Sequence, residues 1–341
     1  MKYFFRIILL TFICFSTKAQ DAHFTQFNST PIFLNPAMTG VFLNYSKGAA
    51  TDMENSSRLI ANTRSQWSGT QSSYNSAFLQ YDKRLTKLYG FDEEHIENPF
   101  NLGVSCLYDQ SLLGALKNAY VSVSGSYQIP LSENMSSLGI GANCSYTNRI
   151  LDLSKISFSQ QFTSGGFNLD LPSGENALSN MKPFLSFGTG LVYRYKDETD
   201  ENFLNIGVSA LNVNKPKQSF YTDEKQFLPI RYTAEGNWTH VNIKSRIEAF
   251  FFYQNQATVN EVMGGIVLDY FIDDNDIPEK IIGAGISYRH KDAISPYLRL
   301  EIKNLMIGCS YDITTSKLSK AVQTPKSFEI SLQCLFKNND N

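Results

Sequence analysis

Cysteine is the most reactive side-chain type in this chain, but its spacing indicates neither a metal site nor a disulfide. Zinc-binding thiolates come in close pairs with each other or with histidine, and the sequence has no such pair. The five cysteines are Cys14, Cys106, Cys144, Cys309 and Cys334. Cys14 falls in the leader described below. The other four occupy apolar positions of alternating segments, so we expect unpaired thiols that face lipid as small hydrophobic groups.

Histidines, nucleophiles and acidic stretches also lack a catalytic arrangement. The histidines are His23, His95, His240 and His290, with no H-E-x-x-H spacing among them. No G-x-S-x-G elbow or glycine-rich phosphate loop is present. The acidic stretches 92–97 and 273–276 could offer oxygens to calcium, but neither follows EF-hand spacing, so we interpret both as solvated turns. The sequence therefore predicts no enzyme, no cofactor and no metal site.

Composition and the first residues point to export. Residues 1–19 have a basic start (Lys2, Arg6), an apolar run and small residues up to Ala19, which is typical of a cleaved secretory signal peptide. A lipid anchor on Cys14 is the alternative, but the bulky Ile13 precedes it where a small residue is expected. The net charge is −2 over 341 residues with no basic patch, which argues against a nucleic-acid partner.

The body of the chain, residues 58–341, alternates apolar and polar residues over segments of about ten residues, as transmembrane β-barrels do. In the segment 120–131, Val121, Val123 and Tyr127 share one face, while serines share the other. We predict about fourteen strands, an even number as single-chain barrels require. The predicted strands are 58–67, 73–83, 102–109, 120–131, 138–149, 183–195, 203–213, 231–239, 246–254, 262–271, 281–289, 296–303, 305–313 and 327–336.

A soluble β-sandwich is the alternative to a barrel, and two features favour the barrel. The polar faces carry charged residues as well as hydroxyls, which suits a wet lumen. The apolar faces carry tyrosine and phenylalanine near strand ends, for example Tyr81, Tyr108 and Tyr288, as in the aromatic belts of membrane proteins. We therefore predict an all-β transmembrane antiparallel barrel in the outer membrane, surrounded by lipid.

Gap lengths predict which end of the barrel faces outward. If both termini are periplasmic, the long gaps 150–182 and 214–230 are extracellular, and the tight turn at residues 303–304 is periplasmic. The long gap 84–100 is the exception, because it falls on the periplasmic side.

The stretch from Gln20 to Gly40 is neither leader nor strand. Pro31 and Pro36 disfavour helix at the residues before them, and the stretch is rich in phenylalanine and amides with almost no charge. We predict that residues 20–57 form an extended segment packed in or under the lumen, with Phe24, Phe27 and Phe33 against the wall. A loose linker is the alternative.

We also expect three lumen arginines to hold this segment. Arg58, Arg64 and Arg231 should hydrogen-bond the amides of Gln26 and Asn35 and the carboxylate of Asp21.

Several motifs of the chain resemble the PorP/SprF family of Bacteroidetes outer-membrane proteins. The N-terminal motif comprises Gln20-Asp21, His23-Phe24, Gln26-Phe27, Asn35-Pro36-Ala37 and Gly40. The barrel motifs comprise Arg64-Ser65-Gln66-Trp67, Tyr311-Asp312-Ile313, Ser316-Lys317-Leu318 and Phe328-Glu329-Ile330. Ala22 departs from the pattern, because a proline is more usual there.

This resemblance implies a role in the type IX secretion system. A family member would support secretion and surface attachment of cargo proteins such as gliding adhesins, by binding the cargo's C-terminal domain together with other secretion components. A passive porin or small-solute uptake channel is the alternative function.

Overall fold

The computed structural model describes residues 23–42, 57–68, 73–85, 100–132, 135–168, 170–174, 181–219, 226–273, 275, 278–316 and 326–336. The predicted signal peptide, Gln20, Asp21 and Leu318 lie outside the described residues. Within the described residues, no helix is long and apolar enough to cross a membrane.

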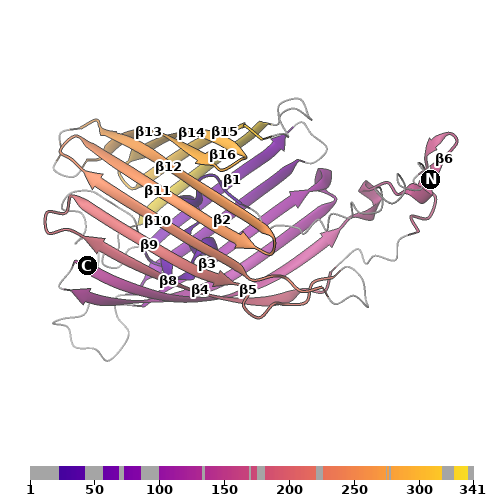
Figure 1. Cartoon of the computed structure of the whole chain (residues 1–341), viewed down its shortest axis with the longest axis horizontal. Coiled ribbons are helices and arrows are strands. Elements are labelled where there is room, and N and C mark those ends of the chain that lie inside the picture. Colours follow the sequence, from indigo (N-terminus) through magenta and orange to yellow (C-terminus); the bar gives the residue numbers. More distant parts are fainter. Residues whose placement is uncertain are drawn as a thin grey trace, which may run out of the picture.

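Fourteen antiparallel strands form a closed barrel (Figure 1). They are β1 Ser57–Ser68, β2 Tyr74–Arg84, β3 Phe100–Ser111, β4 Leu116–Ser132, β5 Ser136–Leu151, β8 Phe184–Lys196, β9 Asn202–Leu211, β10 Arg231–Val241, β11 Ser245–Gln256, β12 Val259–Phe271, β13 Lys280–Arg289, β14 Ala293–Ile302, β15 Leu305–Thr314 and β16 Lys326–Phe336. Each strand pairs with the next barrel strand in the chain, and β1 pairs with β16 to close the ring.

The strand prediction is confirmed. All fourteen predicted strands are present, and the largest boundary difference is at β4, which begins at Leu116 rather than at residue 120. Closure excludes the sandwich, because a sandwich consists of two separate sheets packed face to face and this chain forms one closed sheet.

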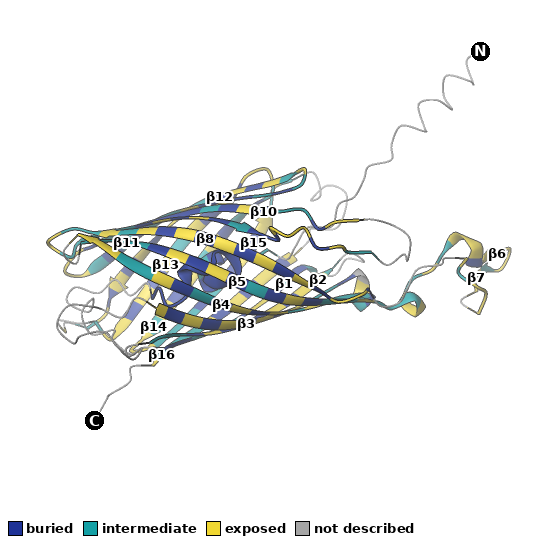
Figure 2. Ribbon diagram, turned by 90° about the horizontal axis from the view of Figure 1, so that it is seen from below, coloured by how far each residue is buried: buried dark blue, intermediate teal, exposed yellow. Residues whose placement is uncertain are grey.

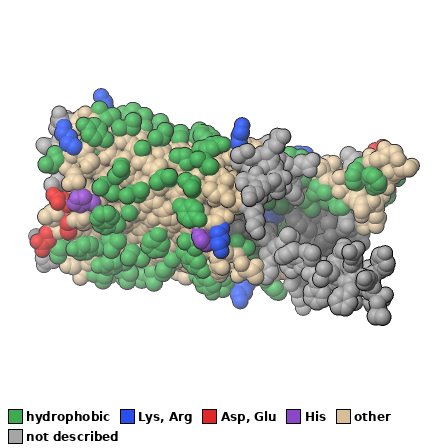
Figure 3. Space-filling view, turned by 45° about the horizontal axis from the view of Figure 1, so that its top comes forward, with side chains coloured by type: hydrophobic (Ala, Val, Ile, Leu, Met, Phe, Trp, Pro, Cys, Tyr) green, Lys and Arg blue, Asp and Glu red, His purple; other side chains and the backbone are tan. Residues whose placement is uncertain are grey.

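The side chains alternate between an apolar exterior and a polar interior along each strand (Figure 2). On β3, Leu102 and Val104 are exposed, whereas Asn101 and Ser105 are buried. Figure 3 shows apolar side chains over the side of the barrel and charged side chains near its margins. Such a surface suits lipid outside and a hydrogen-bonded interior. The cysteines follow the same alternation: Cys106, Cys144, Cys309 and Cys334 are unpaired and lie on the exterior face, as predicted.

The barrel has two distinct ends, which we name the turn end and the loop end. The turn end carries the start of β1 and the end of β16, because Ser57 pairs with Phe336. The loop end carries the long β5–β8 and β9–β10 connections. The β5–β8 connection holds a small hairpin, β6 Phe162–Thr163 and β7 Gly166–Phe167, which extends beyond the barrel (Figure 1). This hairpin is not predicted from the sequence, because strands of two residues are too short to show an alternating pattern.

Residues 23–42 lie inside the barrel, and we name this segment the plug. Instead of an extended peptide, it forms three short helical pieces: η1 Phe27–Ser29, α2 Pro31–Leu34 and η2 Pro36–Met38. Thr30 and Asn35, the residues before the prolines, are non-helical and separate the pieces. The other short helices are η3 Leu112–Gly114, η4 Leu153–Lys155 and η5 Ser159–Gln161 in the loop-end connections.

Candidate functional site

The plug crosses the lumen from the loop end to the turn end. His23 contacts Arg289, the last residue of β13, whereas Phe42 lies beside Arg58 at the start of β1. The even strand number predicts both termini on the same side of the membrane, but His23, the first described residue, lies at the loop end, opposite the end of β16. The even strand number fixes only where the first strand begins and the last one ends.

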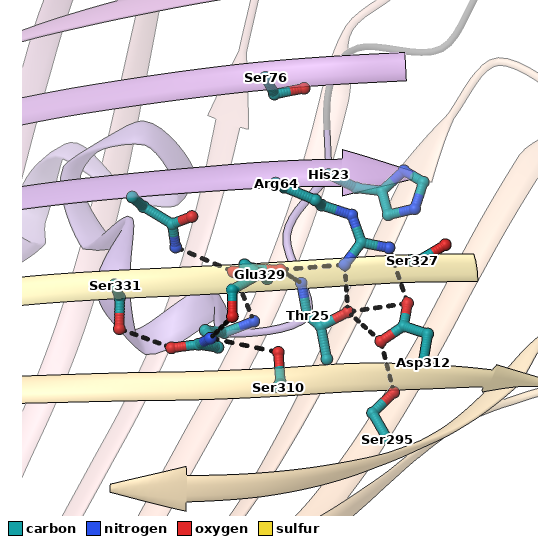
Figure 4. Close-up of polar contacts among 12 residues, drawn as sticks. His23, Thr25, Arg64, Ser76, Ser295, Ser310, Asp312, Ser327, Glu329 and Ser331 are labelled. Carbon is teal, nitrogen blue, oxygen red and sulfur yellow. Dashed lines mark hydrogen bonds and ion pairs between the residues drawn. The ribbon is translucent and has the colours of Figure 1, made fainter. Parts of the chain in front are cut away.

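A buried ionic cluster holds the plug near the loop end (Figure 4). Arg64 pairs with Asp312 at 2.7 Å and with Glu329 at 2.9 Å, and Arg289 pairs with Asp312 at 2.7 Å. These four side chains are at most 4% exposed, so their charges compensate one another in a place that water scarcely reaches.

Thr25 is the plug residue at the centre of this cluster (Figure 4). Its hydroxyl donates to Asp312 at 2.9 Å and accepts from Arg64 and Arg289, each at 2.6 Å. The Glu329 carboxylate accepts from the backbone N–H groups of Thr25 at 2.7 Å and Gln26 at 3.0 Å. The sequence reasoning missed Thr25, because nothing in a lone threonine foretells four ionised neighbours.

Gln26 continues the contact towards β15 and β16. Its amide nitrogen donates to the Ser310 hydroxyl at 3.1 Å and to the Glu329 carbonyl at 3.0 Å. Its amide oxygen accepts from Ser331 at 2.5 Å. The side chain is thus fully satisfied by the wall, which makes it a specific contact.

The phenylalanines of the plug pack against wall aromatics, as predicted. Phe27 stacks on Phe252, with ring centroids 5.3 Å apart, and lies 5.3 Å from Phe250. Phe24 and Phe33 both contact Phe78, at 6.1 and 5.9 Å. This cluster lies inside an otherwise polar lumen, so only an internal apolar partner keeps its surface from water.

The Asn35-Pro36-Ala37 turn packs directly against the backbone of β5, β8 and β9. The fully buried Asn35 amide donates to the Leu191 carbonyl at 3.0 Å and to the Glu235 carboxylate at 2.9 Å. Its oxygen accepts from the Ala37 N–H at 3.0 Å and so closes the turn.

Three inward glycines make room for this turn. A methyl group at Gly141 would overlap the backbone of Pro36 and Ala37, and one at Gly190 or Gly207 would overlap the Asn35 side chain. We name Gly141, Gly190 and Gly207 the glycine seat. At these three positions the plug occupies the space that a side chain would otherwise fill.

The turn-end part of the plug is held by a second ionic pair. Arg58 pairs with Asp82 at 2.8 Å and donates to the Val41 carbonyl at 3.0 Å. The Gly40 N–H donates to Asp82 at 2.8 Å. Gly40 has φ +70°, a conformation that favours glycine. Phe42 lies against the guanidinium groups of Arg58 and Arg84, 5.1 and 4.9 Å from its ring centre.

The expected arginine contacts exist but reach different acceptors. Arg58, Arg64 and Arg231 all touch the plug, but they donate to backbone carbonyls and to Thr25 rather than to the amides of Gln26 and Asn35. Arg231 donates to the Phe33 carbonyl at 2.7 Å, and its guanidinium lies over the Phe33 ring at 4.4 Å. Short helical pieces leave carbonyls unfilled, and these are the natural acceptors for guanidinium groups.

The predicted barrel-motif residues do not form a single site. Arg64, Asp312 and Glu329 form the loop-end cluster, and Gln66 faces the interior beside it. Tyr311 and Phe328 face outward and pair across β15 and β16. Trp67 has φ 53° where the β1–β16 register shifts, and its ring packs on Tyr74. Ser316 ends the described part of the β15–β16 connection and donates its N–H to the Asp292 carbonyl at 3.2 Å.

A cavity lies between the plug and the loop end. Its volume is only about 30 Å³, counted as the space open to the centres of water-sized molecules, and Phe33 of the plug forms part of its lining. Its other lining residues include Asn118, Tyr120, Arg149 and Arg231. The plug contacts strands around the whole ring, including β1, β4, β9, β11 and β16.

A closed barrel with an apolar exterior and an internally plugged lumen defines an outer-membrane β-barrel protein. The chain belongs to the family of type IX secretion system membrane proteins PorP/SprF, whose model matches residues 16–334. No curated protein sequence matches the chain.

Solved structures with a similar fold include a transporter and a channel. The toluene transporter TbuX of Ralstonia pickettii has 11% identity and a TM-score of 0.45, over 89% of this chain and 91% of that one. The monoaromatic hydrocarbon channel CymD has 10% identity and a TM-score of 0.49, over 91% of this chain and 93% of that one. This likeness concerns the fold only.

Proposed function

We propose that this protein is a secretion-associated partner of exported cargo, which binds the cargo's C-terminal domain at the outer membrane, and that the plug keeps its barrel closed to solutes. Family membership supports a role in type IX secretion, together with other components of that system. Closure of the barrel by the plug rests on the burial of nearly all of residues 24–42 within the lumen. A barrel of this width would otherwise enclose water.

The passive-porin alternative needs an open lumen. The plug fills the interior with aromatic rings and with the Asn35 turn, and its polar groups are bonded to the wall from end to end. Solute flow would require these contacts to break, whereas cargo binding at either end would not. The filled lumen therefore favours the secretion role over the porin role.

The loop-end hairpin is the surface that we assign to the cargo domain. Phe162 and Phe167 are 64% and 57% exposed and pack on each other at 5.1 Å. The long connections of such barrels face the cell exterior, where exported cargo arrives. Exposed apolar groups away from the membrane belt usually have a protein partner.

Deletion of the gene, followed by analysis of the secreted proteins and of motility, tests the proposal. We expect a defined set of cargo proteins to disappear from the surface and medium, while other exported proteins remain. Complementation with the F162S/F167S double variant should restore the barrel but not cargo retention, because both side chains are more than half exposed. An unchanged secretome combined with reduced uptake of small solutes would instead establish the porin function.

A further inference from the structure

The lumen wall binds the plug in the manner of a peptide receptor. Wall side chains reach the plug backbone at several points: Glu329 accepts from the N–H groups of Thr25 and Gln26, and Arg231 donates to the Phe33 carbonyl. Ser209 donates to the Leu34 carbonyl at 2.6 Å, and Ser126 to the Thr39 carbonyl at 2.7 Å. Main-chain bonds of this kind supply affinity for a polypeptide.

Side-chain contacts add selectivity for one kind of peptide. The aromatic cluster accepts phenylalanine at positions 24, 27 and 33, and the glycine seat accepts only a turn that brings an asparagine amide between Leu191 and Glu235. Residues 23–42 contain no lysine, arginine, aspartate or glutamate. Arg58, Arg64 and their acidic partners are paired with one another, so a ligand needs no charge of its own to satisfy them.

The plug reaches β1 through residues 43–56, and its described contacts with the wall are non-covalent. Tethering of this kind gives a ligand an effective concentration of about millimolar, so a modest affinity is enough to fill the site. We propose that the lumen is a peptide-binding site for uncharged, aromatic segments with an Asn-Pro turn, and that such a segment supplied as a separate molecule occupies it when the plug does not. This inference does not depend on the cargo proposal.

A synthetic dye-labelled peptide of residues 23–38 is the probe, and its binding to purified protein in detergent is the measurement. The protein lacking residues 21–38 should bind the peptide saturably, whereas the intact protein, whose site is filled, should not. Replacing Asn35 by alanine in the peptide should weaken binding about tenfold or more, because it leaves the Glu235 carboxylate without that donor.

A matched pair of barrel variants controls for adsorption. Gly141→Ala in the deletion protein should abolish binding, because the added methyl group overlaps the peptide backbone. Gly125→Ala should not, because a methyl group there meets its nearest atom at 3.6 Å on the outer face. Absence of binding, or binding that Gly141→Ala leaves unchanged, would overturn the inference.

A second route serves if the deletion protein does not fold. A protease site placed between residues 43 and 56 lets the plug be cut after the full chain has folded. An excess of the labelled peptide should then exchange into the barrel with release of the cut plug. Retention of the cut plug without any exchange over days would equally overturn the inference.

Discussion

At the scale of single residues, the lumen is organised by ion pairs that water scarcely reaches. Arg64, Asp312 and Glu329 come from three strands, and all three also contact Thr25 of the plug. Removing one member of such a cluster leaves a buried charge without its partner, which costs more than the pair itself contributes. Surface pairs carry no comparable penalty.

We therefore expect Arg64→Met to lower the free energy of unfolding by about 3–5 kcal/mol, as measured by urea denaturation in detergent. Lys196→Ala is the control, because its pair with Asp200 is 26% and 30% exposed and should contribute about 0–1 kcal/mol. Equal small losses for the two variants would show that the cluster is better solvated than its burial indicates.

The lipid-facing cysteines give a second test at this scale. Cys144 lies in β5 on the face that carries Ile140 and Tyr146, so a membrane-impermeant thiol reagent should not label it in the folded, bilayer-embedded protein. Leu113→Cys, at a loop-end position that is 63% exposed, should label readily. Cys144→Arg should cost about 2–4 kcal/mol near the bilayer midplane. Rapid labelling of Cys144 would contradict the assigned face.

At the scale of elements, the prolines and the glycine seat together shape the plug. Pro31 and Pro36 each begin a short helical piece, and the non-helical residues before them separate the pieces. The segment is therefore compact and irregular instead of one continuous helix. Strands β5, β8 and β9 contribute Gly141, Gly190 and Gly207 where the Asn35-Pro36-Ala37 turn of the plug contacts the wall.

Gly141→Ala should unseat the plug in the intact protein. We expect chymotrypsin to cleave after Phe33 in the folded variant at a rate at least tenfold above that of wild type, because an unseated segment is accessible to protease. Gly125→Ala should match the wild type. Protection of the plug in both variants would mean that the wall yields to the extra methyl group.

The β8–β9 turn carries a pH-dependent contribution to stability. Partial burial opposes ionisation of Asp197, but hydrogen bonds from the Asn202 side chain and from the N–H groups of Asn202 and Glu201 outweigh it and lower the pKa of Asp197 from 3.8 to about 2. A depressed carboxyl pKa stabilises the folded state above the unfolded pKa, and this stabilisation is lost as the pH falls towards 2. The stability difference between wild type and Asp197→Asn should therefore be larger at pH 6 than at pH 2. A difference independent of pH would show that these bonds do not favour the charged form.

The sequence predicted elements well where an alternating pattern continues over many residues, and poorly where the element is only two or three residues long. Alternation over segments of about ten residues revealed all the barrel strands, and charge and aromatic content indicated that residues 20–57 pack against the barrel. Two-residue strands β6 and β7 and three-residue helices such as η2 have no detectable period. The partners of Arg58 and Arg231 depend on how the plug turns inside the barrel, which local sequence does not encode.

At the scale of the whole molecule, the barrel and the plug form one closed unit. The lumen charges pair along the wall, the aromatic cluster fills the middle, and the plug joins the loop-end and turn-end ionic clusters. A channel needs none of these features, but a secretion component in the outer membrane needs a barrel that does not leak. Closure by the chain's own N-terminal segment is thus the central claim.

The conductance of the purified protein in planar lipid bilayers tests this claim most directly. The intact protein should show almost no ion current, and the protein lacking residues 21–38 should form stable, water-filled channels, because the wall that remains is polar and the barrel is wide. Gly125→Ala in the intact chain should stay closed and serves as the matched control. Equal conductance of the intact and the deleted protein, whether high or absent in both, would contradict closure by the plug.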